Sequence, residues 1–212
     1  YYTALNELVS RRLGGLHSAS IVLHSFDFAP LEVLQRQGRW DEATGLMITA
    51  ARGLEAAGAS CLLICSNTMH LMADEVADAL KIPLLHIADV TAAAINESSA
   101  TAPLLLATRY TMEQDFYRTR LLRHGVNVLI PEAEDRSLVN QVIFDELCLG
   151  LIKPESKAAW LDVVARAQAQ GADSVIFGCT EVALLLQPED LTLPCFDTTA
   201  LHAAAAVDFA LG

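Results

Sequence analysis

Two short polar segments of the chain combine side chains that can move protons with side chains that can bind a small anion. The first is Ser66-Asn67-Thr68, directly after Cys65, and the second is Cys179-Thr180-Glu181. Thiols and hydroxyls can act as acids, and a thiolate can act as a base. Each segment ends an apolar run and opens a helical pattern, a place where helix N-termini favour anions and lower a thiol pKa from about 8.5. The pattern predicts a reactive thiolate at Cys179.

The two segments occupy equivalent places in an internal repeat. Residues 57–68 read Ala-Gly-Ala-Ser-Cys-Leu-Leu-Ile-Cys-Ser-Asn-Thr, and residues 170–181 read Gln-Gly-Ala-Asp-Ser-Val-Ile-Phe-Gly-Cys-Thr-Glu. A second echo joins 82–86 and 91–94 to 193–197 and 202–205. Any two strand–helix units look somewhat alike, but here the glycine, the apolar run, the polar tip and the later proline recur in the same order. The repeat predicts two pseudo-symmetric lobes whose polar segments face one cleft.

Apolar runs alternate with helical patterns along the chain, which indicates an α/β fold. Several runs are continuously apolar, as expected for strands buried on both faces of a parallel sheet. The expected strands are 20–24, 61–66, 84–87, 103–107, 126–130, 174–178 and 194–196. The expected helices are 1–13, 40–57, 69–80, 112–124, 137–149, 157–170 and 181–186, followed by an Ala-rich C-terminal helix. The first lobe is predicted at 1–98, with 199–212 returning to it, and the second at 99–198.

Composition narrows the class of partner. The chain of 212 residues has a formal net charge of -12, which disfavours nucleic acid and acidic membrane surfaces. No apolar stretch approaches the roughly 20 residues of a membrane span, and we expect no signal peptide. The five cysteines lack a C-x-x-C spacing, so neither a disulfide framework nor a metal site is expected. These features predict a cytoplasmic protein that binds a small molecule.

A pair of acid/base groups related by a two-fold axis suits one reaction in particular. Removing the α-proton of an amino acid and returning it to the opposite face needs one such group on each side of Cα. A buried structural cysteine is the alternative interpretation of Cys179, and its position at a repeated strand end favours the catalytic one.

The motifs that carry this chemistry resemble a known family. Cys65-Ser66-Asn67-Thr68-Met69-His70 and Phe177-Gly178-Cys179-Thr180-Glu181 are similar to the paired C-N-T and G-C-T-E motifs of the aspartate/glutamate racemases. Residues 108–114 and 194–198 also resemble this family, particularly its broad-specificity and L-glutamate/aspartate branch. The resemblance implies two α/β domains, racemisation of amino acids, no pyridoxal phosphate, no metal and a homodimer.

The resemblance also suggests roles for individual residues. Cys179 is expected to be the principal acid/base, with Ser66 as its unequal partner, because Ser66 stands where the family has its first catalytic cysteine. Cys65 lies one position earlier and is expected to point into the core, since successive strand side chains face opposite ways; whether Cys65 is the second acid/base stays open. The predicted substrate-binding residues are Asn67, Thr68, Thr111, Thr180 and Glu181, with His202 as a relay.

Several features leave alternatives open. His70 and His86 are further candidate relays, and Arg36, Arg39 and Arg109 are candidate cations for the substrate side chain. The family begins with a strand and a Gly-Gly-Met-Ser-like loop, which we expect upstream of Tyr1. A one-cysteine decarboxylase or isomerase of the same superfamily and a catalytically impaired amino-acid-binding protein are the alternative functions. A zinc hydrolase built from Cys65, His70, Cys179 and His202 lacks the local ligand spacing of zinc sites.

Overall fold

The computed structural model describes residues 1–212, which fold into two compact units. The first unit comprises Tyr1–Ile64, Met69–His86 and Ala203–Gly212, and the second comprises Cys65–Thr68 and Ile87–His202. The main part of the second unit thus begins at Ile87 rather than at residue 99, and the unit also includes the polar segment within Cys65–Thr68. Both chemistry-bearing segments therefore belong to the second unit.

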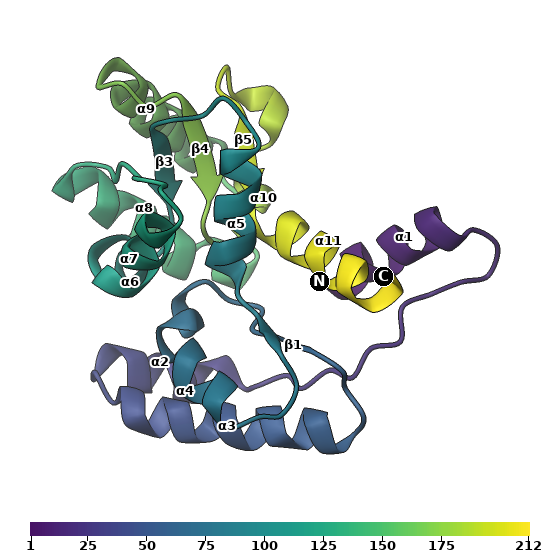
Figure 1. Ribbon diagram of the computed structural model, residues 1–212. Helices are drawn as coiled ribbons and strands as arrows, with labels where there is room; N and C mark the ends of the chain where they lie inside the picture. The colour runs from purple at the N-terminus through teal and green to yellow at the C-terminus, as the bar shows by residue number, and fades with distance from the viewer. The chain divides into compact units, whose positions relative to one another are not determined.

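The first unit packs helices around a short parallel strand pair. Its helices and strands are α1 (Tyr2–Leu13), α2 (Phe28–Arg36), α3 (Trp40–Ala56), β1 (Leu62–Leu63), α4 (Ala73–Asp78) and β2 (Leu84–Leu85). The 3-10 helix η1 (Thr68–Met72) begins in the second unit and continues into the first. Helices α2, α3 and α4 lie together in Figure 1, and their apolar faces bury Leu31, Ala43 and Val76. The sequence missed α2, which Asp27 caps by accepting a hydrogen bond of 3.3 Å from the Ala29 amide.

Two expectations for the first unit are wrong. The segment 20–24 is not a strand, because β1 pairs only with β2 and no strand lies beside this segment to form a ladder. Its Leu23 side chain is 66% exposed. The helix expected at 69–80 is divided into η1 and α4, which meet at Met72.

The second unit is built on a sheet of three parallel strands in the order β3-β4-β5. Its helices and strands are α5 (Ile87–Asn96), β3 (Pro103–Leu106), α6 (Arg109–Glu113), α7 (Asp115–Arg123), α8 (Ala133–Asp145), η2 (Leu147–Leu149), α9 (Pro154–Ala169), β4 (Ser174–Phe177), α10 (Val182–Leu185), η3 (Pro188–Asp190), β5 (Cys195–Asp197) and α11 (Thr198–Leu211), which continues into the first unit. The strand expected at 126–130 is reduced to one parallel bridge between Leu129 and Leu104.

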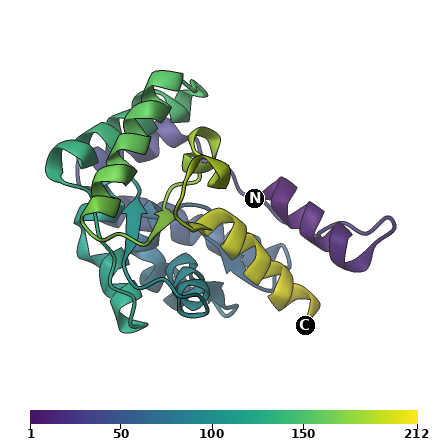
Figure 2. The same ribbon diagram turned by 90° about the horizontal axis from the view of Figure 1, so that it is seen from above.

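The strands β3 and β4 form the centre of the second unit's core. Every residue of both strands is buried, and α5 and α9 lie on opposite faces of the sheet (Figures 1 and 2). Burial on both faces explains why these strands read as continuous apolar runs rather than as alternating patterns. The predicted α/β fold with parallel sheets is confirmed.

Candidate active site

Polar residues follow each strand of the second unit's sheet at the same edge. Leu106 pairs with Phe177, and Phe177 pairs with Asp197, so β3, β4 and β5 end at one level. Thr108, Cys179 and Thr198 come one or two residues after these ends. The carboxyl ends of parallel strands are the usual ligand-binding edge of an open α/β sheet. This edge is the candidate active site.

Gly178 determines where the chain leaves β4. Its amide donates a hydrogen bond of 2.8 Å to the Leu106 carbonyl, which continues the pairing with β3. A Cβ atom at this position would lie 2.7 Å from Leu105 Cδ1 and 2.9 Å from Ala107 Cβ. The absence of a side chain at Gly178 therefore makes room for the neighbouring strand β3. The backbone that leads into Cys179 is therefore held in place by β3.

The thiol of Cys179 is partly buried and shares a carboxylate with its neighbour. Cys179 Sγ donates to Glu181 Oε2 at 2.8 Å, and Thr180 Oγ1 donates to the same oxygen at 2.7 Å. Burial raises the pKa of Cys179 well above that of an ordinary thiol, and the charge of Glu181 and its hydrogen bond raise it further. The expected lowering by a helix N-terminus is wrong, because α10 has only 4 residues and Glu181 stands at its start. The resting side chain is a protonated thiol.

A second thiol, that of Cys148, lies near the same carboxylate, although no sequence pattern singles it out. Cys148 belongs to η2, which packs against α10. Partial burial and the charge of Glu181 raise the pKa of Cys148 to about 11. Burial and the charge of Glu181 therefore both favour the protonated form of Cys148 and Cys179.

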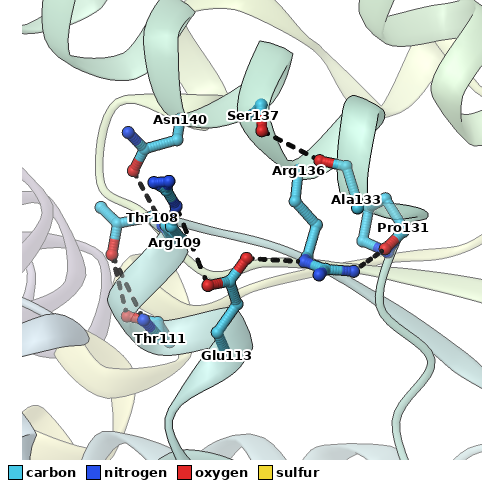
Figure 3. Close-up of polar contacts among 9 residues, drawn as sticks. All are labelled: Thr108, Arg109, Thr111, Glu113, Pro131, Ala133, Arg136, Ser137 and Asn140. Carbon is cyan, nitrogen blue, oxygen red and sulfur yellow. Dashed lines mark hydrogen bonds and ion pairs between the residues drawn. The ribbon is translucent and has the colours of Figure 1, made fainter.

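Three buried threonine hydroxyls form a triangle beside the end of β3. Thr68 Oγ1 lies 2.8 Å from Thr108 Oγ1 and 3.1 Å from Thr111 Oγ1, and the last two oxygens are 3.2 Å apart. Thr108 also caps α6 by accepting a hydrogen bond from the Thr111 amide (Figure 3). Because each hydroxyl proton can rotate, the triangle can turn donors toward an anion. Thr68 and Thr111 were predicted. Thr108 was missed, although a threonine between an apolar run and a helix is a preferred N-cap residue.

The candidate cation in this unit is held by a carboxylate. Arg109 Nε lies 3.8 Å from Glu113, and Arg136 Nε donates to the same carboxylate at 2.9 Å (Figure 3). The other two candidate cations lie in the first unit and pair with nearby glutamates, Arg36 with Glu32 at 3.4 Å and Arg39 with Glu42 at 2.6 Å. The structure thus gives each predicted arginine an ion-pair partner.

Asn67 connects the first polar segment to the end of β4 through Thr198. Asn67 Nδ2 donates to Thr198 Oγ1 at 3.0 Å, and Thr198 Oγ1 donates to the Phe177 carbonyl at 2.7 Å. Thr198 and Asn67 are both buried, and Asn67 Oδ1 has no hydrogen-bond partner in the protein. Thr198 was missed, since nothing in Asp-Thr-Thr distinguishes it from an ordinary helix start.

The remaining predicted residues are placed as follows. Ser66 is partly buried, and Cys65 is exposed rather than in the core, because β1 ends at Leu63 and strand alternation no longer applies at residue 65. His202 is fully buried, one turn of α11 after Thr198. In the first unit, the buried rings of His70 and His86 lie with their centroids 4.5 Å apart. No group of His, Cys, Asp or Glu side chains is arranged to hold a metal ion, and none of the helices combines the length and apolarity needed to cross a membrane.

Comparison with known proteins gives one consistent answer. The profile of the Asp/Glu/hydantoin racemase family matches residues 1–206. The broad-specificity amino-acid racemase RacX of Bacillus subtilis (strain 168) is 27% identical over 171 residues, which cover 79% of this chain and 72% of that protein. A candidate Asp/Glu racemase from Yersinia pestis has a solved structure that is 49% identical with a TM-score of 0.92, and the match covers 100% of this chain and 93% of that one. An aspartate racemase homologue from Pyrococcus horikoshii OT3 is 30% identical with a TM-score of 0.84 over 100% of this chain and 93% of that one. The chain therefore belongs to the Asp/Glu/hydantoin racemase family.

Proposed function

We propose that this protein racemises aspartate or glutamate without a cofactor, by moving the α-proton between two side chains. The observation that carries the proposal is the Cys179 thiol hydrogen-bonded to Glu181 at the carboxyl end of β4. A thiol with an adjacent proton acceptor can serve as acid and, once deprotonated, as base.

The substrate's charged groups match the polar atoms at this sheet edge. The α-carboxylate would accept hydrogen bonds from the hydroxyls of Thr68, Thr108 and Thr111, which lose little by turning their protons from one another to an anion. The ammonium group would donate to Asn67 Oδ1, a buried acceptor that otherwise has no partner. Leaving such an acceptor unpaired costs free energy, so the site gains when a donor arrives.

Proton removal begins when Cys179 loses its own proton. The positive charge of a bound ammonium group favours the thiolate, and Glu181 Oε2, 2.8 Å away, can receive the thiol proton. The thiolate then takes the α-proton, and the electron pair left on Cα delocalises into the α-carboxylate. The threonine hydroxyls stabilise the added negative charge, as donors aimed at developing charge do in other enzymes. The high pKa of Cys179 makes its thiolate a strong base once formed.

Ser66 is the proposed donor on the opposite face. A serine hydroxyl is a much weaker acid and base than a thiol, so the two faces are unequal. His202 is the proposed relay that exchanges protons with this side. The pair predicts that the two enantiomers lose their α-protons at different rates, while the equilibrium ratio stays at unity.

The substrate class is inferred from the relatives. The Yersinia pestis protein, 49% identical, is described as a candidate Asp/Glu racemase, and the Pyrococcus horikoshii protein as an aspartate racemase homologue. The Bacillus subtilis relative has broad specificity. We therefore expect aspartate and glutamate to be turned over fastest in a panel of substrates, and other amino acids more slowly. A homodimer, implied by the family resemblance, is a further proposal that sedimentation velocity can test.

The test is racemisation of each enantiomer of aspartate and glutamate, followed by chiral chromatography. Cys179→Ser should lose about 10²–10⁴-fold in turnover while retaining ligand binding, because the hydroxyl keeps the shape and loses the accessible base. Cys61→Ser, a partly buried cysteine of the first unit, is the matched control and should stay near wild type. Binding without turnover by the wild type would favour an amino-acid-binding protein, and decarboxylation of a disubstituted malonate would favour the one-cysteine decarboxylase.

A further inference from the structure

We propose that Thr198 is a positioning residue for substrate recognition, because its hydroxyl fixes the Asn67 amide so that Oδ1 faces the ligand as an acceptor. The inference rests on the proposed function, since it assigns the ligand's ammonium group as the partner of Oδ1. It adds a residue from the start of α11 that touches neither the reacting atoms nor the ligand.

The direction of the amide follows from the number of protons available. A hydroxyl group has one proton to donate and lone pairs to accept with. The Phe177 carbonyl can only accept, so the Thr198 proton goes to it, at 2.7 Å. In its other contact, 3.0 Å from Asn67, Thr198 Oγ1 must therefore accept a hydrogen bond. Only Nδ2 of the amide can donate, so Oδ1 is turned away from Thr198.

Burial makes this arrangement specific. Thr198 is 0% exposed and Asn67 is 3% exposed, so water is a poor substitute for either partner. Asn67 Oδ1 is an acceptor with no protein donor within reach. A buried acceptor of this kind selects a ligand group that donates, such as an ammonium, over one that accepts. Without Thr198 the amide can rotate and present Nδ2, which repels an ammonium group.

Thr199 supplies a matched control next in the chain. The Thr199 hydroxyl is also buried but has no hydrogen-bond partner. Its backbone amide donates a hydrogen bond of 2.8 Å to Asp197 and so helps to cap α11, but its side chain does not. Thr199→Val therefore makes the same chemical change as Thr198→Val at the same helix start, without touching the Asn67 amide.

The experiment measures binding of aspartate and of succinate, which lacks the amino group, by calorimetry. Thr198→Val should weaken aspartate binding by about 10- to 100-fold, the factor expected from losing a hydrogen bond to a charged group, and change succinate binding less than about 3-fold. Thr198→Ser and Thr199→Val should keep the wild-type preference. In an Asn67→Ala background, Thr198→Val should leave the already reduced preference unchanged, which shows that Thr198 acts through Asn67.

Equal loss of both ligands in Thr198→Val, or an undiminished preference for aspartate, overturns the inference. A wild type that does not distinguish aspartate from succinate overturns the proposed function instead, and the inference with it. If Thr198→Val does not fold, the neutron crystal structure of Cys179→Ser with bound aspartate decides, because it distinguishes the amide NH₂ group from the amide oxygen. Oδ1 of Asn67 on the ammonium group and Nδ2 on Thr198 support the inference, and Nδ2 on the ligand contradicts it.

Discussion

Cys179 Sγ lies 2.8 Å from Glu181 Oε2, and the negative charge of that carboxylate opposes ionisation of the thiol to which it is bonded. Cys179 is therefore protonated in the resting protein, and the Glu181 carboxylate is an adjacent acceptor to which the proton can move. It reverses the simple expectation that a cysteine beginning a helix is already a thiolate.

Replacing Glu181 by Gln should make Cys179 easier to ionise. The variant removes a negative charge that raises the thiol pKa, although burial, the larger cause, remains. The pH profile of Cys179 alkylation by iodoacetamide, followed by peptide mass spectrometry, should move to lower pH, with a several-fold faster reaction near pH 8. Turnover should fall at the same time, because the proton acceptor is lost. An unchanged alkylation profile would show that Glu181 does not govern the thiol.

Gly178→Ala should destabilise the second unit and reduce turnover. The added Cβ would meet Leu105 Cδ1 at 2.7 Å and the Leu106 carbonyl oxygen at 3.2 Å, so the end of β4 must shift. Overpacking of this kind costs about 1–3 kcal/mol. Gly45→Ala, an exposed position within α3 where a Cβ meets nothing within 4 Å, is the control and should be neutral or stabilising. Urea unfolding measures both; equal stability of the two variants would contradict this role of Gly178.

Asp173 should contribute stability that disappears in acid. Burial raises its pKa, but hydrogen bonds from Thr101, Ala102 and Ser174 together outweigh burial and lower the pKa from 3.8 to about 2. Because the folded pKa lies below the unfolded one, the ionised carboxylate stabilises the fold above about pH 3.8, and this contribution is lost as the pH falls toward 2. Asp173→Asn should therefore lower the melting temperature at pH 7 and lower it less at pH 3. An equal deficit at both pH values in Asp173→Asn would rule the linkage out.

Ser66→Cys should change the two directions of racemisation unequally. A second thiol, with an ordinary pKa near 8.5, replaces a much weaker acid on one face. The slower direction should accelerate more than the faster one, measured as initial rates from each pure enantiomer. An unchanged ratio in Ser66→Cys, together with loss of both directions in Cys65→Ala, would identify the exposed thiol of Cys65 as the second acid/base.

The sequence predicted the parts of the fold that depend on local pattern. The apolar runs of β3 and β4 indicated buried parallel strands, and the polar residues after β4 marked the sheet edge. It failed at 20–24, where the apolar run has no neighbouring strand to pair with, which periodicity cannot reveal. It overestimated the strand at 126–130, where pairing with β3 is limited to a single bridge at Leu129. Thr108 and Thr198 were missed because their importance lies in contacts with distant residues, Thr68 and Asn67. The pKa of Cys179 was misjudged because burial and one carboxylate outweigh the dipole of a helix of 4 residues.

Cys179 is the proposed principal acid/base, which removes and returns the α-proton of an acidic amino acid. Proton NMR in heavy water, with pure L- and D-aspartate and glutamate, follows the Cα–H signal directly. We predict that the signal disappears with wild-type protein, at different rates for the two enantiomers, and persists at least about 10²-fold longer with Cys179→Ser. Retention of the Cα–H signal by wild type would contradict the proposed racemisation, and equal exchange in Cys179→Ser would contradict the role of Cys179.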